Sequence, residues 1–418
     1  MACAGTGRRL ALCSVLICGV CACGGKGSAA GSAPRGSASQ APAPPASPAP
    51  SAPTAAQIVA SACASPQGPS GGQATTSDAA FATKDPALFA WLLFLSINCP
   101  ANPGLSQPVI WETWKPDTSV YLPGGAAPAP WSAPLPPRLL LDQPEIDGYT
   151  LLDDHGLPVL NEIRLNQATF EYVVQRQLYS KAGQLAFFTD PHSAPVVFPA
   201  DAMEIKAAWL ILTPGDPANA NYYSINASYV DGAGQTHQVL AGLAGLHISS
   251  KILPNWFWTT FEQEDNQETT QAPQTVPIAP DVQAVNAAIH AALPTNSIWR
   301  HYHQRGAQID FTGVGGTPTL LSDTLLETRF QKSSSCITCH ALSTRGSEQE
   351  GRVAFFRVGN GMQGYVGTLN SPSNKYFDPF QKPVCYSASV PGFTDCNPTR
   401  PAVVYKMLDF VWSLREAQ

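Results

Sequence analysis

Glu204-Ile-Lys-Ala-Ala-Trp-Leu-Ile-Leu212 begins the part of the sequence that decides the fold. It is the first of four runs rich in aliphatic, aromatic and β-branched residues, and turn residues such as Pro214, Gly215 and Gly232 separate them. The other three runs are residues 222–231, 239–252 and 256–264. Because consecutive strands with short connections usually pair with each other, the four runs predict an antiparallel meander.

Helices on either side of these runs are expected to pack against the sheet. Residues 86–95, Pro-Ala-Leu-Phe-Ala-Trp-Leu-Leu-Phe-Leu, form an apolar helical segment with proline in its first turn, ended by Asn98-Cys99-Pro100. Asn166 is suited to cap a second helix that carries Phe170. Residues 109–115, Val-Ile-Trp-Glu-Thr-Trp-Lys, predict a further strand. The predicted fold class is therefore α+β, an antiparallel strand-rich domain with packed helices.

Farther along the chain, Cys336-Ile-Thr-Cys-His340 has the spacing of an attachment site for c-type haem. Two thiols separated by two residues lie on one side of a short helical turn, where both can form thioethers with the haem vinyl groups. The adjacent His340 then points its imidazole at the iron as the proximal ligand. The sequence therefore predicts one covalent haem c, held by Cys336, Cys339 and His340.

Two other interpretations of the paired cysteines are open. A zinc site would need a second Cys/His pair at ligand spacing, and the next cysteines, Cys385 and Cys396, are distant and wrongly spaced. A thioredoxin-like dithiol would need a βαβ context, which is not apparent in this sequence.

The sequence around the motif predicts a helical haem domain over residues 312–418, packed on the strand-rich domain, residues 78–311. After a glycine-rich stretch, residues 320–331 read as a helix that leads into the motif. Residues 401–416 predict an amphipathic helix, because apolar residues recur at helical spacing. Helices before the attachment site and at the C-terminus are how small c-type cytochromes cover their haem.

The sixth iron ligand separates electron transfer from catalysis. Met362 is the first candidate, because it lies in a glycine-rich segment that could present a thioether to iron. His247 is the second, since it alternates with Ser249 and Lys251 on one side of the third run. Met407 fits better as a core residue of the last helix.

A catalytic alternative involves the same strand. If the third and fourth runs form a hairpin, His247, Lys251, Trp258 and Glu262 line one pocket. Aromatic residues with a base and an acid beside an open haem suit a peroxidase-like reaction or the oxidation of a small molecule. The simpler interpretation buries the tryptophans and leaves Lys251 and Glu262 as a surface pair.

The N-terminus has the features of an exported lipoprotein. Arg8 and Arg9 precede an apolar segment of signal-peptide length, which is too short to span a membrane. Val20-Cys21-Ala22-Cys23 resembles the bacterial lipobox, which predicts a signal peptide over residues 1–22 and lipidation of Cys23; an ordinary signal peptide cut elsewhere is the alternative. Gly24, rather than Asp, favours the outer membrane by lipoprotein sorting habit. The expected location is the outer membrane, facing the periplasm or the cell surface.

Composition describes the rest of the chain. Residues 23–77 are rich in Ala, Pro, Ser and Gly and predict a disordered tether. The net charge of −6, with 13% charged residues and no basic block, argues against a nucleic-acid partner. The expected partner is a redox protein or a small-molecule electron donor or acceptor. The size of the strand-rich part also suits a module that docks onto another redox protein.

Four cysteines remain after those assigned to the signal peptide, lipid and haem. An even remainder in an exported protein favours disulfides. Cys385 and Cys396 would close a short loop and are the preferred pair, with Cys63 and Cys99 as the complementary pair. Buried free thiols are the alternative.

Several phrases, spread from residue 86 to residue 413, resemble a group of bacterial secreted proteins known only as cytochrome c family, without an assigned reaction. The resemblance implies an exported redox protein with a single haem and names no substrate. The phrases are residues 109–115, Glu204-Ile-Lys-Ala-Ala-Trp, Gly245-Leu-His-Ile-Ser-Ser-Lys, Trp256-Phe-Trp-Thr-Thr-Phe-Glu, residues 324–327 with Ser335-Cys-Ile-Thr-Cys-His, and Asp409-Phe-Val-Trp-Ser.

Overall fold

The computed structural model describes residues 53–64, 75–102, 104–142, 151–266, 276–311, 313, 319–327, 331, 334–341, 343–346, 384–385 and 404–418. They belong to one compact unit that spans residues 51–418. The α-helices among them are α1 (Ala55–Ala62), α2 (Thr76–Lys84), α3 (Pro86–Ile97), α4 (Gln167–Gln175), α5 (Lys181–Thr189), α6 (Pro280–Ala292) and α7 (Cys336–His340). The strands are β1 (Lys115–Pro116), β2 (Leu139–Leu141), β3 (Leu160–Leu165), β4 (Met203–Ile211), β5 (Ser224–Val230), β6 (Thr236–Ser250), β7 (Phe257–Gln263), β8 (Tyr302–Gln308), β9 (Thr344–Arg345), β10 (Val384–Cys385) and β11 (Val404–Met407).

The four predicted strands are confirmed as β4, β5, β6 and β7, and the chain combines helices with a strand-rich sheet. Strands β5, β6 and β7 are consecutive antiparallel neighbours, and β8 continues the sheet beyond β7. The arrangement differs from a simple meander because β4 pairs with β3 and β6 instead of β5. Strand β2 pairs with β3 and lies parallel to β5, so the pairings close a ring of strands.

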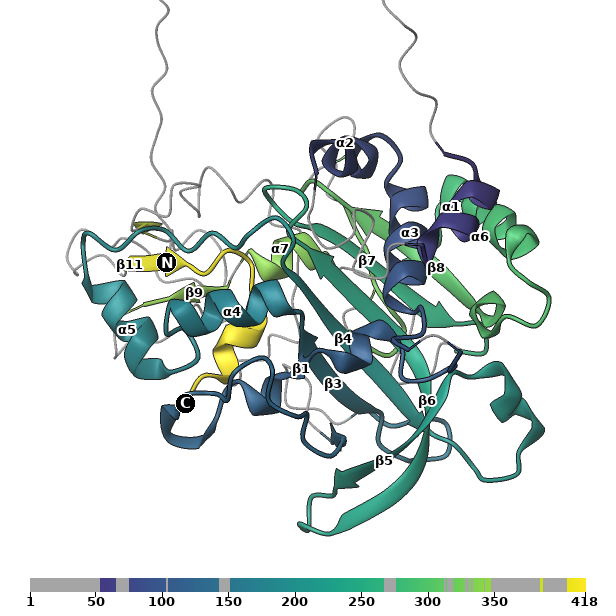
Figure 1. Cartoon of the computed structure of the whole chain (residues 1–418), viewed down its shortest axis with the longest axis horizontal. Helices are drawn as coiled ribbons and strands as arrows, with labels where there is room; N and C mark the ends of the chain where they lie inside the picture. The colour runs from purple at the N-terminus through teal and green to yellow at the C-terminus, as the bar shows by residue number, and fades with distance from the viewer. Residues whose placement is uncertain are drawn as a thin grey trace, which may run out of the picture. The chain divides into compact units, whose positions relative to one another are not determined.

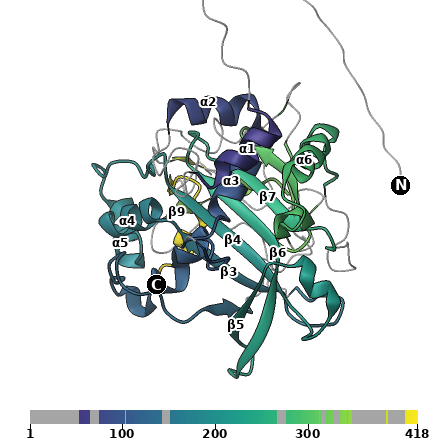
Figure 2. The same ribbon diagram turned by 45° about the vertical axis from the view of Figure 1, so that its right-hand side comes forward.

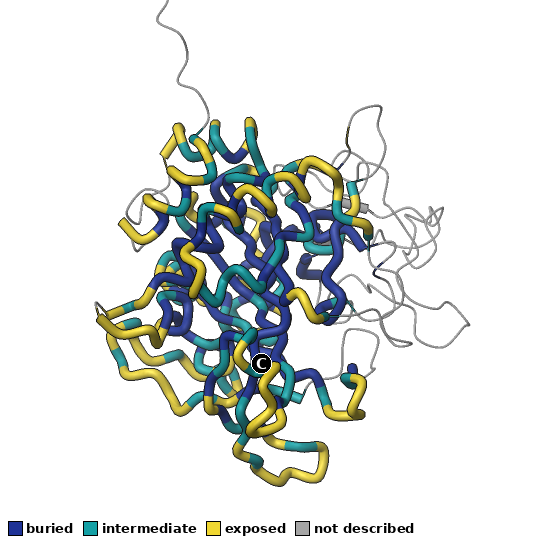
Figure 3. The backbone as a smooth tube through the Cα atoms, turned by 90° about the vertical axis from the view of Figure 1, so that its right-hand side faces the viewer, coloured by how far each residue is buried: buried dark blue, intermediate teal, exposed yellow. Residues whose placement is uncertain are grey.

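The sheet separates two hydrophobic cores. Helices α1, α3 and α6 cover one side, where the rings of Phe94 and Phe261 stack with centroids 4.1 Å apart (Figure 1). On the other side lie α4, α5 and α7 with the C-terminal residues. The turned view shows α4 and α5 beside the C-terminus (Figure 2). Side chains alternate along a strand, so Leu246 and Ile248 of β6 join the first core while His247 faces away from it. Every residue of β7 is buried, and buried backbone fills the middle of the described part of the molecule (Figure 3).

Both predicted N-terminal helix signals are confirmed. Helix α3 begins at Pro86, with the Asp85 carboxylate accepting a hydrogen bond from the Leu88 amide. The side chain of Asn166 caps α4 by accepting a hydrogen bond from the Thr169 amide at 3.0 Å.

The Cys63–Cys99 disulfide is present and joins the ends of α1 and α3, with a Cα–Cα distance of 5.6 Å. Helix α1 and the first residues of α2 lie within residues 23–77, so regular structure begins earlier than the predicted tether allowed. Thr54 and Gln57 form a capping box that starts α1, a local signal that the apolar and proline-rich composition obscured.

The strand predicted over residues 109–115 is wrong. Residues Ile110–Thr113 form a turn of 3₁₀ helix, because the Glu112 carboxylate accepts a hydrogen bond from the Val109 amide at 2.7 Å. Only Lys115–Pro116 at its end joins the sheet, as β1.

The helical prediction for the C-terminal part also fails in the described residues. Within residues 401–416, Val404–Met407 is strand β11, which pairs with β9, and Trp412–Glu416 is a 3₁₀ helix. Asp409 and Phe410 between them have positive φ angles of 49° and 69°, which a continuous α-helix does not allow. Residues 321–327, inside the segment predicted as helix, form irregular chain, a turn and a bend instead.

Candidate functional site

Helix α7 places the C-x-x-C-H motif against the sheet. At its two ends, the amide of Cys339 donates to Ser335 O at 2.8 Å and the amide of Ala341 donates to Ile337 O at 2.9 Å. The side chain of Gln308, at the end of β8, accepts a hydrogen bond from the Ile337 amide at 3.2 Å. Gln308 therefore holds α7 at the end of β8. Because α7 is a short helical turn, both thiols and the histidine of the motif lie together there.

The C-terminal strap, residues 404–418, fixes His340. The ring nitrogen Nδ1 of His340 lies 2.8 Å from the carbonyl oxygen of Phe410. Nδ1 is therefore the protonated nitrogen, and Nε2 carries the lone pair. The indole of Trp412 donates to the carbonyl oxygen of Cys339 at 2.8 Å, and Ser343 donates to that of Val411 at 2.6 Å. This is the arrangement that orients metal-binding histidines in many proteins, with one ring nitrogen bonded to a backbone carbonyl.

His247 of β6 lies next to His340, on the side of the sheet. Its ring centroid lies 5.9 Å from that of His340, and the side chain of Trp258 contacts both rings, with its centroid 4.4 Å from His340 and 6.1 Å from His247. His247 is 8% exposed, and neither of its ring nitrogens has a hydrogen-bond partner among the described residues. A buried polar group without a partner is uncommon in native proteins and points to an unseen ligand or ion.

A cavity connects these groups. Its empty volume is about 1250 Å³ with its opening to solvent included, and it is lined by β3, β4, β6, α7 and the C-terminal strap. The residues that bear on its chemistry are Cys336, Cys339, His340, His247, Asp117 and Glu204. The structure therefore brings both motif cysteines and two histidines from distant parts of the chain to one cavity.

Burial controls the protonation of the cavity. It lowers the pKa of His247 to about 3, helped by the charges of His340 and Lys206, and that of His340 to about 4. Both imidazoles are therefore neutral near pH 7. Burial also raises the pKa of Asp117 and of Glu204 to about 7 each, with the Asp117 charge contributing to the shift of Glu204.

The two thiols do not have the properties of a redox dithiol. Cys336 and Cys339 form no disulfide. Burial raises the pKa of each thiol, and the nearby charge of Glu327 adds to both shifts. A redox-active cysteine needs a readily formed thiolate. The redox-dithiol interpretation of the motif is therefore weakened.

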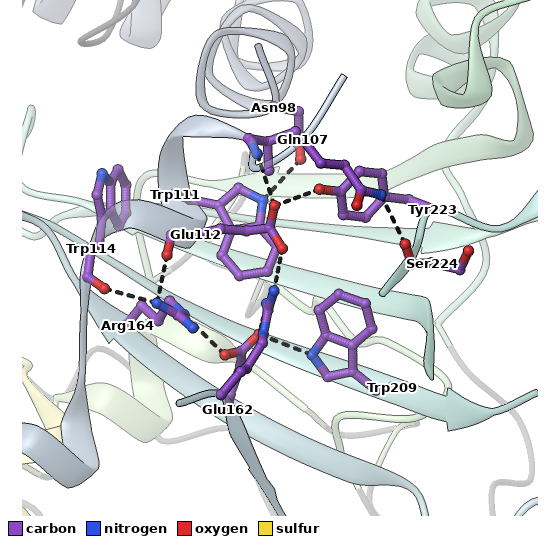
Figure 4. A network of polar contacts seen from close by, with 12 residues as sticks. Asn98, Gln107, Trp111, Glu112, Trp114, Glu162, Arg164, Trp209, Tyr223 and Ser224 are labelled. Atoms are coloured by element: carbon purple, nitrogen blue, oxygen red, sulfur yellow. Dashed lines mark hydrogen bonds and ion pairs between the residues drawn. The ribbon is translucent and has the colours of Figure 1, made fainter. Parts of the chain in front are cut away.

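A buried charge network supports the cavity from the side of β3 (Figure 4). Arg138 forms ion pairs with Glu112 and Glu162, and its guanidinium lies 5.3 Å from the Trp111 ring centroid and 5.0 Å from that of Trp209. Glu162 lines the cavity and also pairs with Arg164 at 2.9 Å. The network holds the chain before β1 against β3, because Arg164 also donates to the carbonyl oxygens of Glu112 and Trp114.

The structure separates the four residues that the catalytic alternative places in one pocket. His247 lines the cavity, and Trp258 contacts the ring of His340. Lys251 instead pairs with Asp409 at 2.6 Å, and Glu262 pairs with Arg305 at 2.8 Å. Neither Lys251 nor Glu262 is a surface residue, since they are 8% and 1% exposed.

Several predicted residues lie outside the described residues: Met362, Cys396 and Cys23. Cys385 lies in β10, where only its backbone is described. Nothing in the sequence indicated that Asp117 and Glu204 line the cavity, or that Phe410 accepts a hydrogen bond from His340. The phrase Asp409-Phe-Val-Trp-Ser could have pointed to this contact, because its residues cover α7. The sequence instead predicted that these residues belong to a continuous helix.

Two features are absent from the described residues. No three or more His, Cys, Asp or Glu side chains in this part of the chain are grouped so that they could hold a metal ion by themselves. In the same residues, no helix has the length and apolar character needed to cross a membrane.

Comparisons with known proteins add no relative to this picture. No family model matches the chain, and neither a curated protein nor a solved structure matches it.

Proposed function

We propose that this chain is an exported c-type cytochrome that binds one haem covalently and transfers electrons. Cys336 and Cys339 would form the thioethers, and His340 would bind the iron through Nε2. The observation that carries the proposal is the meeting of these three residues with His247, a buried histidine without hydrogen-bond partners among the described residues, at one cavity. A bound haem would supply an iron that gains and loses one electron.

The residues around the cavity fit this group. The Phe410 carbonyl oxygen accepts the hydrogen bond of His340 Nδ1, which leaves Nε2 available to a metal. Trp258 packs against His340 and limits the access of water to that ring. Cys336 and Cys339 form no disulfide, so both sulfurs are available for thioether formation.

His247 is the described residue best placed to be the ligand on the other side of the iron. Its ring faces the cavity from β6, opposite the short helix that carries His340. With both axial positions filled by protein, the iron would have no position for a substrate, which favours electron transfer. Met362 remains a candidate, since it lies outside the described residues.

Carbon monoxide tests this assignment. The reduced wild-type protein is expected to bind carbon monoxide slowly or not at all, and the His247→Ala variant is expected to bind it rapidly, because an axial position has been opened. The measurement is the change in the visible spectrum after mixing. His237→Ala is the matched control, because His237 lies on the same strand but pairs with Asp231 away from the cavity.

Two results would contradict the assignment. Rapid binding to the wild type would mean an open iron and would favour the second candidate function. A His247→Ala variant that still excludes carbon monoxide would mean that another residue, such as Met362, is the ligand.

The second candidate function is haem-dependent oxidoreduction of a small molecule, by a peroxidase-like or related oxidation. The observation that favours it is the pair of carboxyl groups, Asp117 and Glu204, in the same cavity as the motif. Groups that can hold or release a proton beside an open haem suit such chemistry.

We also propose that a lipid on Cys23 anchors the protein to the outer membrane. The lipobox-like sequence at residues 20–23 supports this location. The Cys23→Ala variant is expected to move the pigment from the membrane fraction to the soluble fraction of cells. Mass spectrometry of the mature wild-type N-terminus checks the modification, and an unacylated terminus would refute it.

A further inference from the structure

The geometry points to Lys251 and Asp409 as positioning residues that set the strength of the His340–iron bond, through the hydrogen bond that Phe410 accepts from His340. This inference rests on the proposed haem binding and adds to it a specific role for an ion pair outside the cavity lining. Neither residue belongs to the C-x-x-C-H motif.

The backbone that accepts the hydrogen bond is held in an unfavourable conformation. Asp409 and Phe410 are consecutive residues, neither of them glycine, with φ angles of 49° and 69°. Left-handed backbone is sparsely populated by such residues, and it persists only where surrounding contacts impose it. Here it turns the Phe410 carbonyl oxygen toward His340 Nδ1, 2.8 Å away.

The Asp409 carboxylate provides the contacts that impose this turn. One oxygen accepts a hydrogen bond from Lys251 Nζ at 2.6 Å, and the other accepts one from the Phe198 amide at 2.7 Å. Lys251 also donates to the carbonyl oxygen of Pro254 at 2.7 Å. The side chains of Lys251 and Asp409 are 8% and 7% exposed, so the pair is shielded from solvent.

The ion pair therefore ties the left-handed turn to the rigid sheet. Lys251 follows directly after β6, the strand that also carries His247. The same strand thus presents one histidine to the cavity and, through Lys251 and Asp409, orients the backbone that holds the other. Strap residues after the turn bind α7 independently, because Trp412 donates to the Cys339 carbonyl oxygen.

The expected consequence concerns the iron. A hydrogen bond from Nδ1 to a carbonyl makes the imidazole a stronger ligand, and loss of such a partner typically weakens metal binding by about 10- to 100-fold. A stronger imidazole donor favours ferric over ferrous iron. Weakening the hydrogen bond between His340 Nδ1 and the Phe410 carbonyl oxygen should therefore raise the reduction potential of the iron.

The test uses the double variant Lys251→Met/Asp409→Asn, which removes the ion pair without changing the net charge. We expect it to keep covalent haem. The solvent exchange of the His340 ring N–H, followed by NMR in the reduced protein, should become at least about tenfold faster. A tenfold loss of ferric preference corresponds to a rise of about 59 mV in reduction potential.

Asp117→Asn, measured at pH 8, is the control for charge alone. It removes a carboxylate of the cavity that does not touch the turn, so it should alter the potential while the His340 ring N–H exchanges as in the wild type. If the double variant does not accumulate, the same two measurements are made on Asp409→Asn alone. This variant keeps one contact of the turn, because Asn can still accept a hydrogen bond from the Phe198 amide.

The outcomes separate the two proposals. A wild-type protein without covalent haem would refute the proposed function itself. Covalent haem with unchanged ring N–H exchange in the ion-pair variant would refute the positioning role, even if the protein became less stable. Faster exchange with a raised potential would support it.

Discussion

The Cys336→Ala/Cys339→Ala variant is expected to lose all covalently bound haem, while wild-type protein from cells that can mature c-type cytochromes keeps its pigment after extraction with acidified acetone. The reason is chemical, because each thioether needs one of these sulfurs. Both side chains line the same cavity, and neither forms a disulfide. The measurement is the visible spectrum of denatured protein together with its intact mass.

The control for this variant lies inside the motif. Thr338 accepts a hydrogen bond from the Ser335 hydroxyl at 2.9 Å and contributes no sulfur, so Thr338→Ser should retain covalent haem. Two findings would end the proposal: a colourless wild-type protein from such cells, or wild-type pigment that acid acetone removes. Retention of covalent pigment in the double cysteine variant would show that attachment occurs elsewhere.

The sheet could be predicted from the sequence because its strands are continuous and locally marked. The runs that became β4 to β7 combine β-branched and aromatic residues with turn residues at their ends, and these signals do not depend on the rest of the fold. Alternation along β6 also placed His247 on the side away from the first core. That single local rule identified the residue that the structure brings opposite His340.

The C-terminal strap could not be predicted in the same way. Val404, Met407, Val411 and Leu414 recur at helical spacing, and this pattern predicted a helix. The left-handed conformation at Asp409 and Phe410 interrupts that helix. This conformation depends on Lys251, which is far away in the sequence. Tertiary contacts of this kind override local periodicity.

The cavity shows the same limit. No local pattern marks Asp117 or Glu204 as a cavity residue, and they meet only because β3, β4 and the C-terminal strap pack together. Their raised pKa values come from that burial, which no local pattern reveals. The cysteine motif, by contrast, needs only five consecutive residues and was legible from the sequence alone.

The Arg138→Met variant is expected to lose about 3–5 kcal/mol of unfolding free energy, the usual cost of removing one partner from a buried ion pair. The substitution would leave the carboxylates of Glu112 and Glu162 without their shared arginine, in a site where both are almost fully buried. The guanidinium contacts with the Trp111 and Trp209 rings would be lost as well. Denaturation by urea, followed by tryptophan fluorescence, measures the change.

The exposed pair Arg415–Glu416 is the matched control. Its atoms are 3.1 Å apart with side chains 43% and 38% exposed, so Arg415→Met should cost no more than about 1 kcal/mol. The double variant Arg138→Met/Glu112→Gln should recover part of the loss, because it removes the carboxylate whose ion pair is lost, whereas Glu162 keeps its ion pair with Arg164.

The pH dependence distinguishes unpaired charge from lost packing. Arg138 and Arg164 together hold the pKa of Glu162 lowered, and without Arg138 only Arg164 opposes its burial, so this pKa would rise in the folded protein. The folded variant would then bind more protons than the folded wild type, so its stability deficit relative to the wild type should shrink as the pH falls from 8 toward 5. A deficit that is constant over this range would mean that the tryptophan contacts, and not the carboxylates, make Arg138 necessary. In that case the network would support the cavity through packing alone.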